Sequence, residues 1–181
     1  ISGDALALEA NEGIQLLIET LKAFVFNSDK HVLYKAKLTH LYHIIQKGKS
    51  FSADVWLKFK ENDVQSLQGE LPKELLENWE HWQKLPLVHL VEKLIEAYGL
   101  TSLHNAHLPY ILAFKDMIAN FSANGERGIN QFLIFWEEDG IKSVLPSSGK
   151  VDAIEVTTVH KSKGLAYDVV MIPFCNWTLD G

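Results

Sequence analysis

The spacing of apolar side chains is the feature that most restricts how this chain can fold. From residue 10 to about residue 139, apolar residues recur every three or four positions, as they do on one face of an α-helix. This pattern predicts an all-α fold up to residue 139. The residues that carry it are Ile14, Leu17, Ile18, Leu21 and Val25; Tyr34, Leu38, Leu41, Tyr42 and Ile45; Leu87, Leu90, Val91, Leu94 and Tyr98; Ile111, Leu112, Phe114, Met117, Ile118 and Phe121; and Ile129, Phe132, Leu133 and Trp136.

Prolines, glycines and one serine mark where these helices begin and end. Ser52 is placed to cap a short helix over residues 53–60. Proline suits the first turn of a helix because the backbone N–H that it lacks has no partner there. Pro72 thus predicts a single helix that runs through Trp79 and Trp82. The other starting prolines are Pro86 and Pro109, and the terminating glycines are Gly48, Gly99 and Gly140.

The pattern changes after residue 145. Residues 146–149 have the composition of a loop, and two short apolar runs follow at 154–159 and 169–174. We expect these runs to be buried strands joined by the compact turn 160–168. Because a parallel sheet needs further strands and covering helices, the tail is expected to belong to a larger α/β domain. The predicted fold class is therefore mainly α, with a short C-terminal β-turn-β remnant.

Composition excludes several classes of protein. Hydrophobic residues at 47% and charged residues at 22% are ordinary for a globular protein, and neither a membrane-spanning run nor a secretory signal is seen, so we expect a cytoplasmic protein. Cys175 is the only cysteine, which rules out an internal disulfide. The net charge of −6 and the single arginine, Arg127, argue against a free-standing protein that reads base edges. Any contact with nucleic acid should be local and made to phosphates.

One motif carries most of the functional information. The run Thr158-Val159-His160-Lys161-Ser162-Lys163-Gly164-Leu165 resembles the fifth motif of superfamily 1 DNA helicases of the UvrD/RecB/AddA type, and is most similar to the RecB and AddA branch. Residues 1–8 and the stretch from 132 to 153 are also similar to the segments that flank this region in the family. The resemblance implies two parts, a helical 2B-like accessory subdomain over 1–150 and a partial RecA-like 2A domain over 151–181.

The motif contains groups that suit a phosphate backbone. Thr158 and His160 alternate with a valine and can emerge on one side of a strand end. Lys161, Ser162 and Lys163 add cationic and hydroxyl donors, which position a strand without reading its sequence. The resemblance implies that Thr158 and His160 touch the DNA backbone. The alternative interpretation is a charged turn that only holds two strands together.

The same resemblance implies a nucleotide beside the motif, near Gly164 and Leu165. The chain departs from the family at the next position, because the family usually has a glutamate that approaches the ribose where this chain has Ala166. Asp168 also replaces a common proline. Either the nucleotide contact is weaker in the whole protein, or another side chain supplies it.

The function implied by the resemblance is that of an ATP-dependent DNA helicase, with possible exonuclease activity, in DNA recombination and double-strand-break repair. It implies ATP and Mg²⁺ as cofactors of the whole protein. Its partners would be DNA, as single strand and duplex junction, and a second nuclease or helicase subunit. The chain has no Gly-x-x-x-x-Gly-Lys-Ser/Thr phosphate loop, so we expect no catalytic residue, metal or cofactor here. The competing hypothesis is a non-enzymatic helical protein-interaction module.

Other residue groups have a plainer structural interpretation. Two histidine pairs have the i to i+3 spacing of metal ligands, but neither has a third ligand, so surface or capping histidines are expected. A tryptophan-rich segment has the aromatics that stack on bases, but Glu77 and Glu80 would repel phosphates, so packing is expected. Three consecutive acids are expected to form a solvated helix end. These groups are His40 and His43, His104 and His107, Trp79, His81 and Trp82, and Glu137, Glu138 and Asp139.

The missing phosphate loop leads to a first prediction. The purified 181-residue chain should hydrolyse no ATP, with or without single-stranded DNA, because nothing in it cradles the phosphates or positions Mg²⁺. A coupled ATPase assay over a range of oligonucleotide concentrations measures this. DNA-stimulated turnover that survives controls for contaminating ATPases would contradict the assignment of these residues.

Overall fold

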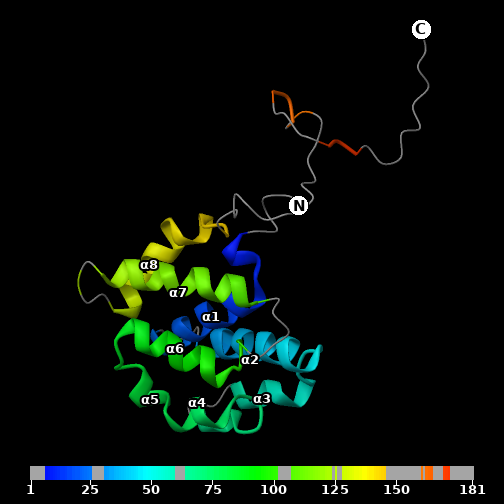
Figure 1. The fold of residues 1–181 in the computed structure, drawn as a ribbon. Helices are drawn as coiled ribbons and strands as arrows, with labels where there is room; N and C mark the ends of the chain where they lie inside the picture. Colours follow the sequence, from blue (N-terminus) through cyan, green and yellow to red (C-terminus); the bar gives the residue numbers. More distant parts are fainter. Residues whose placement is uncertain are drawn as a thin grey trace, which may run out of the picture.

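The chain folds into an array of helices, which confirms the predicted mainly α fold class (Figure 1). The computed structural model describes residues 7–25, 31–59, 64–101, 107–123, 125, 128–145, 160, 162–164 and 169–171. The α-helices of this described part are α1 (Glu12–Val25), α2 (His31–Lys47), α3 (Trp56–Phe59), α4 (Lys73–Glu77), α5 (Trp79–Trp82), α6 (Leu87–Ala97), α7 (Leu108–Ser122) and α8 (Ile129–Glu138). Short 3-10 turns at Leu8–Ala10, Ala53–Val55, Val64–Leu67 and Gly140–Lys142 connect or extend them.

Helix α1 lies in the middle of the array and packs against α2, α6, α7 and α8 (Figure 1). Its apolar side chains cover more than one face, so neighbours can pack on several sides. Leu16, Leu17 and Leu21 are completely buried. The buried residues of α1 are Gly13, Ile14, Leu16, Leu17, Ile18, Thr20, Leu21, Ala23 and Phe24. The helix is therefore the centre of the hydrophobic core.

Asn11 fixes where α1 begins. Its side-chain oxygen accepts hydrogen bonds from the backbone N–H groups of Gly13, at 3.0 Å, and Ile14, at 3.3 Å. These N–H groups have no partner inside the helix, so an asparagine cap satisfies them. The same oxygen lies 3.2 Å from Nδ1 of His107, the residue that precedes α7. One side chain thus starts α1 and ties it to the beginning of α7.

A buried polar network joins α1, α2 and the end of α6. The Thr20 hydroxyl lies 2.7 Å from the carbonyl oxygen of Leu16 and 2.8 Å from the Tyr98 hydroxyl. Because the threonine has one proton, which it donates to Leu16, the tyrosine donates to Thr20. Gln46 of α2 donates to the carbonyl of Tyr98 at 2.9 Å. Burial raises the pKa of the Tyr98 phenol far above the ordinary tyrosine value, against the opposing effect of the Thr20 hydrogen bond.

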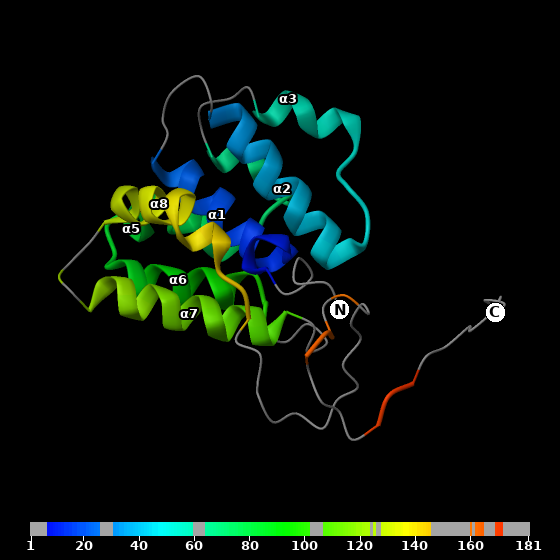
Figure 2. The same ribbon diagram turned by 90° about the horizontal axis from the view of Figure 1, so that it is seen from above.

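Helices α6, α7 and α8 follow the sequence prediction closely. Pro86 precedes α6 directly, and Gly99 follows it with a positive φ of 64°, a conformation that glycine adopts without strain. In Figures 1 and 2, α6 and α7 lie side by side. Phe114 of α7 packs edge-on against Phe132 and Trp136 of α8, with ring centroids 5.8 and 5.7 Å apart. Aromatic packing therefore holds the last two helices together.

The prediction of one helix from Pro72 through Trp82 is wrong. The segment breaks at Asn78, whose φ of −108° and ψ of 10° are not helical, and forms the two short helices α4 and α5. The Asn78 side chain donates to the carbonyl of Glu74 at 2.8 Å. A local side-chain hydrogen bond of this kind offers the backbone an alternative to a regular helix. The spacing of apolar residues contains no information about such a bond, so it could not predict the break.

Ser52 holds the predicted N-cap position, but its side chain makes no capping hydrogen bond. It bonds instead to the carboxylate of Asp54, and this bond is the largest cause that lowers the pKa of that exposed carboxyl. The segment that follows starts as the 3-10 turn Ala53–Val55 before it becomes α3. The predicted end, Lys60, lies outside the described residues.

The two ends of the helical array meet. Ala7 and Val144 form an isolated antiparallel β-bridge, and the backbone N–H of Leu8 donates to the carbonyl of Ser143 at 2.9 Å. Leu8 is also buried, with 1% of its surface exposed. The chain therefore enters and leaves the array at one place.

Only a few residues of the predicted β-turn-β tail are described. Residues 162–164 form a turn, and 169–171 are exposed and pair with no described residue. The rest of the predicted strands, 154–159 and 172–174, lies outside the described residues. None of the helices in the described ranges has both the length and the hydropathy needed to cross a membrane.

The buried Tyr98 phenol predicts how stability depends on pH. Its pKa in the folded chain is raised, so the stability that it contributes is complete below pH 10, the ordinary tyrosine value, and is lost as pH rises above it. Urea unfolding of Tyr98→Phe at pH 7 should show a loss of about 1 kcal/mol, for one hydrogen bond. Between pH 9 and 11 its stability should fall less steeply than that of the parent chain.

Thr20→Val is the matched control for this experiment. It removes the same hydrogen bond but keeps the phenol. Its free energy of unfolding should therefore be lower than that of the parent chain at pH 7, and should still show the full decrease at high pH. Identical pH profiles for Tyr98→Phe and the parent chain would show that the phenol is not protected by burial.

Candidate functional site

The structure describes part of the predicted DNA-contacting motif. His160 and Lys163 are exposed, and Ser162 is half-buried within the turn 162–164. Gly164 has a positive φ of 87°, with no atom within 4 Å of where a Cβ would stand. Thr158, Lys161 and Leu165 lie outside the described residues, as does Ala166.

The described part of the motif has the chemistry of an anion contact. A left-handed glycine lets the backbone turn tightly, which other residues resist. The turn exposes an imidazole and an ammonium group, at His160 and Lys163, and neither group forms an ion pair with another described residue. Groups of this kind donate to phosphate oxygens. The turn can therefore meet a phosphate, whereas its relation to Thr158 and Lys161 stays a prediction.

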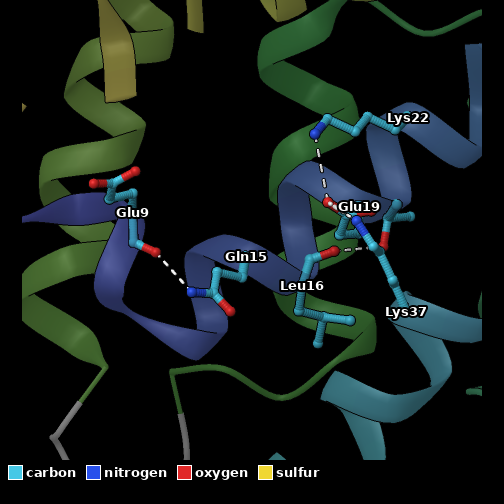
Figure 3. Close-up of polar contacts among 7 residues, drawn as sticks. Glu9, Gln15, Leu16, Glu19, Lys22 and Lys37 are labelled. Atoms are coloured by element: carbon cyan, nitrogen blue, oxygen red, sulfur yellow. Dashed lines mark hydrogen bonds and ion pairs between the residues drawn. The ribbon is translucent and has the colours of Figure 1, made fainter. Parts of the chain in front are cut away.

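A charged groove lies beside α1 and α2. It has a volume of about 380 Å³ and is lined by charged and polar residues together with apolar ones, among them Ile18 and Trp136. Figure 3 shows the polar contacts at this place. Nζ of Lys22 lies 3.4 Å from Oε1 of Glu19, and Nζ of Lys37 lies 3.9 Å from the same atom. Beside them Gln15 donates to the carbonyl of Glu9 at 2.8 Å.

The Glu19 carboxylate is shared between two lysines and is incompletely bonded. Its second oxygen, Oε2, is buried and has no hydrogen-bond partner among the described residues. Lys37 is half exposed, and its long contact with Glu19 holds it weakly. Glu9 also lines the groove, so the two lysines of the groove are matched by two carboxylates and its charge is balanced.

A second hollow, of about 870 Å³, lies beside Trp79. Trp79 packs edge-on against Phe24, with ring centroids 4.4 Å apart, and Trp82 is buried. The predicted packing role of both tryptophans is thereby confirmed. The hollow is lined by Lys35 and Lys84 but also by Glu77 and Glu80. This mixture of charges does not favour a phosphate.

The histidine pairs do not form a metal site in the described part of the chain. His43 is buried rather than at the surface, which corrects the prediction for it: its Nε2 donates to the carbonyl of Glu70 at 3.0 Å. The Glu70 carboxylate lies 3.4 Å from His43 and 2.8 Å from Lys58. His40 is exposed, and its Nδ1 lies 2.8 Å from the Ser50 hydroxyl.

Elsewhere, the described residues contain no group of three or more histidine, cysteine, aspartate or glutamate side chains that could hold a metal ion. The predicted partner of His107, His104, lies outside them. The acids at the end of α8 are exposed, as predicted, and Asp139 pairs with Lys142 at 3.4 Å. These groups have structural roles or face solvent.

The comparisons with known proteins agree on one kind of relative. The chain is 24% identical over 163 residues to an ATP-dependent helicase/nuclease subunit of Bacillus velezensis, and the match covers 84% of the chain and 11% of that protein. It is 22% identical over 170 residues to the RecBCD enzyme subunit RecB of Buchnera aphidicola subsp. Schizaphis graminum, covering 87% of the chain and 14% of that protein. The chain is distantly related to these helicase-nuclease subunits.

A RecB subunit from Buchnera aphidicola subsp. Baizongia pistaciae is similar too, at 25% identity over 112 residues, or 55% of the chain. The chain thus spans between 10% and 14% of the length of these helicase-nuclease relatives. No protein-family model and no solved structure matches the chain. The relation rests on sequence similarity to whole enzymes of which the chain covers a small part.

The contacts of His43 predict that it is a structural residue. His43→Ala leaves the Glu70 carbonyl without its donor and opens a gap beside Phe51, so the free energy of unfolding should fall by about 1–3 kcal/mol. The exposed neighbour gives a matched control, since His40→Ala should change stability by no more than about 0.5 kcal/mol. Thermal unfolding with and without Zn²⁺ completes the test, because a zinc-dependent rise in Tm would instead show a metal site.

Proposed function

We propose that this chain is the helical accessory subdomain of an ATP-dependent DNA helicase of the helicase-nuclease type, followed by the segment that holds one strand of DNA. The distant relation to the helicase-nuclease subunits supports the class of enzyme. In this proposal residues 1–150 are the accessory subdomain and 151–181 begin the second RecA-like domain. The whole enzyme would act on DNA in recombination and double-strand-break repair, together with a second subunit.

The closure of the helical array carries this proposal. The bridge between Ala7 and Val144 and the bond from Leu8 to Ser143 bring the entering and leaving segments together. A domain inserted into another domain needs ends that lie close to each other. The contacts therefore support an accessory subdomain that interrupts a RecA-like domain, with the motif placed soon after the chain leaves the array.

The residues of the motif would hold the backbone of one strand. His160 and Lys163 offer exposed donors, and Gly164 lets the backbone N–H groups of the turn approach the same phosphate. Thr158, Lys161 and Ser162 would add hydroxyl and ammonium donors. Such contacts are independent of base sequence, which suits an enzyme that moves along any strand.

ATP and Mg²⁺ would be held elsewhere in the whole enzyme. No cluster of metal-ligating side chains occurs among the described residues, and the sequence has no phosphate loop. Without a phosphate loop in this chain, the phosphates of ATP would be held by other parts of the whole enzyme. The proposed role of Gly164 and Leu165 beside the nucleotide depends on groups from the rest of the protein.

The role of His160 leads to a mutational prediction. DNA binding by the 181-residue chain should be weak, sensitive to salt and indifferent to sequence, since few basic groups converge in a chain of net charge −6. His160→Ala should weaken binding to single-stranded DNA by about tenfold or more, because a hydrogen bond to a charged group contributes about 1.5–3 kcal/mol. Fluorescence anisotropy of a labelled oligonucleotide at low salt measures this.

His89→Ala, an exposed histidine on α6, is the matched control and should bind as the parent chain does. In the whole enzyme, His160→Ala should leave ATP binding nearly intact. Loss of ATP binding with unchanged affinity for the strand would move His160 to the nucleotide site and contradict the proposal.

A further inference from the structure

Helix α2 and the loop after it form a basic segment in an acidic chain. Between His31 and Ala53 the sequence contains no aspartate or glutamate, although the chain as a whole has a net charge of −6. At 100° per residue, Lys37, His40, Ile44 and Lys47 fall on one face of α2. Lys37, His40 and Lys47 are exposed on this face, and Lys49 is exposed just beyond it. A positive strip thus runs along the outer side of the helix.

Aromatic rings adjoin the middle of this strip, at His40. His40 bonds to Ser50, and its ring lies 6.4 Å from the ring of Phe51. Phe51 packs edge-on against Trp56 at 5.5 Å, and both rings contact the buried Phe59. Trp56 nevertheless keeps 53% of its surface exposed. A supported indole therefore faces solvent, and Phe51 links it to His40 of the strip.

The positive charge of the strip is only partly compensated. Lys47 and Lys49 have no ion-pair partner among the described residues, whereas Lys37 has the 3.9 Å contact with Glu19. Among the described residues of the neighbouring segment, the acids are Asp54, which is bonded to Ser52, and Glu70, which is paired with Lys58. Lys47 and Lys49 are thus free to meet an anion.

We propose that this surface binds single-stranded nucleic acid, with the lysines on successive phosphates and Trp56 stacked on a base. We call it the α2–α3 surface, and it consists of Lys37, His40, Lys47, Lys49, Phe51 and Trp56. A positively charged track with an exposed aromatic ring is the combination that holds single strands without regard to sequence. From Lys37 to Lys47 the strip is about 15 Å long, the length of a few nucleotides.

The composition of the surface favours a single strand over other occupants. In a duplex the base faces are stacked inside, so an exposed indole gains nothing from it. In interfaces between proteins tryptophan is enriched but lysine is depleted. An exposed tryptophan with unpaired lysines nearby fits a ligand that offers both phosphates and open base faces.

This surface goes beyond the proposed function, because it is formed by the accessory helices and is independent of the motif at 158–165. It shares with the motif only the class of ligand. The two regions are therefore tested separately in the same chain.

Binding of a fluorescent oligothymidylate to the 181-residue chain tests the proposal, with a duplex of equal length for comparison. Trp56→Ala should weaken binding of the single strand at least about fivefold, as expected for one stacked base, while Trp56→Phe should keep most of the affinity. The double variant Lys47→Gln/Lys49→Gln should reduce the slope of log affinity against log salt by about 1.4, for two phosphate contacts on a single strand.

The control is Lys73→Gln/Lys142→Gln, which makes the same change in charge at two exposed lysines outside this surface and should leave the slope unchanged. Circular dichroism checks whether each variant is folded. If Trp56→Ala is unfolded, the lysine variants still test the proposal. Unchanged binding by both sets of variants, or tighter binding of the duplex, would overturn the proposal and leave Trp56 as a contact for protein.

The outcomes also separate this surface from the motif. If only His160→Ala weakens binding, the proposed function stands and the α2–α3 surface fails. If only the Trp56 and lysine variants do, the surface stands and the role of His160 fails.

Discussion

The burial of α1 is the constraint on which the rest of the structure depends. A helix with apolar side chains on several sides is stable in water only when other helices surround it. Here α2, α6, α7 and α8 all pack on α1, and Leu16, Leu17 and Leu21 are completely removed from solvent. At roughly 1.5–3 kcal/mol for each large apolar side chain buried, this helix supplies a large share of the driving force for folding.

Polar contacts then fix how the surrounding helices sit on α1. Asn11 ties the beginning of α1 to α7 through His107, and the hydroxyl pair of Thr20 and Tyr98 ties its middle to the end of α6. Buried polar groups are costly unless they are bonded, so only arrangements that satisfy these bonds are stable. One side of α2 is thereby committed to the core, and the other side, with its lysines, is left facing solvent.

Sequence periodicity predicted the helices that bury a continuous apolar face. The predicted positions of α1, α2, α6, α7 and α8 are confirmed, because burial of that face determines them. Periodicity missed the break at Asn78 and the side-chain bond of Ser52, since both depend on local polar contacts. It also missed the burial of His43, because the carbonyl that satisfies this histidine comes from Glu70, distant in sequence.

The two candidate nucleic-acid sites also differ in how far they could be predicted from the sequence. The motif at 158–165 was visible because its residues are adjacent in the sequence, and its proposed role remains to be tested. The α2–α3 surface was not predicted, although the absence of acids between His31 and Ala53 is a signal that sequence reading could have used. The exposure of Trp56 beside His40 and Phe51 depends on how α3 packs against α2, which no local pattern reveals.

The central claim is that a rigid helical array built on α1 carries nucleic-acid contacts on its outside. Hydrogen exchange of the 181-residue chain, measured by mass spectrometry with and without an oligothymidylate, tests it most directly. The account predicts that the amides of α1 exchange most slowly and are unaffected by the oligonucleotide. Added protection should appear around 37–57 and 158–164. Faster exchange in α1 than in α3, or protection gained mainly in α6 and α7, would contradict it.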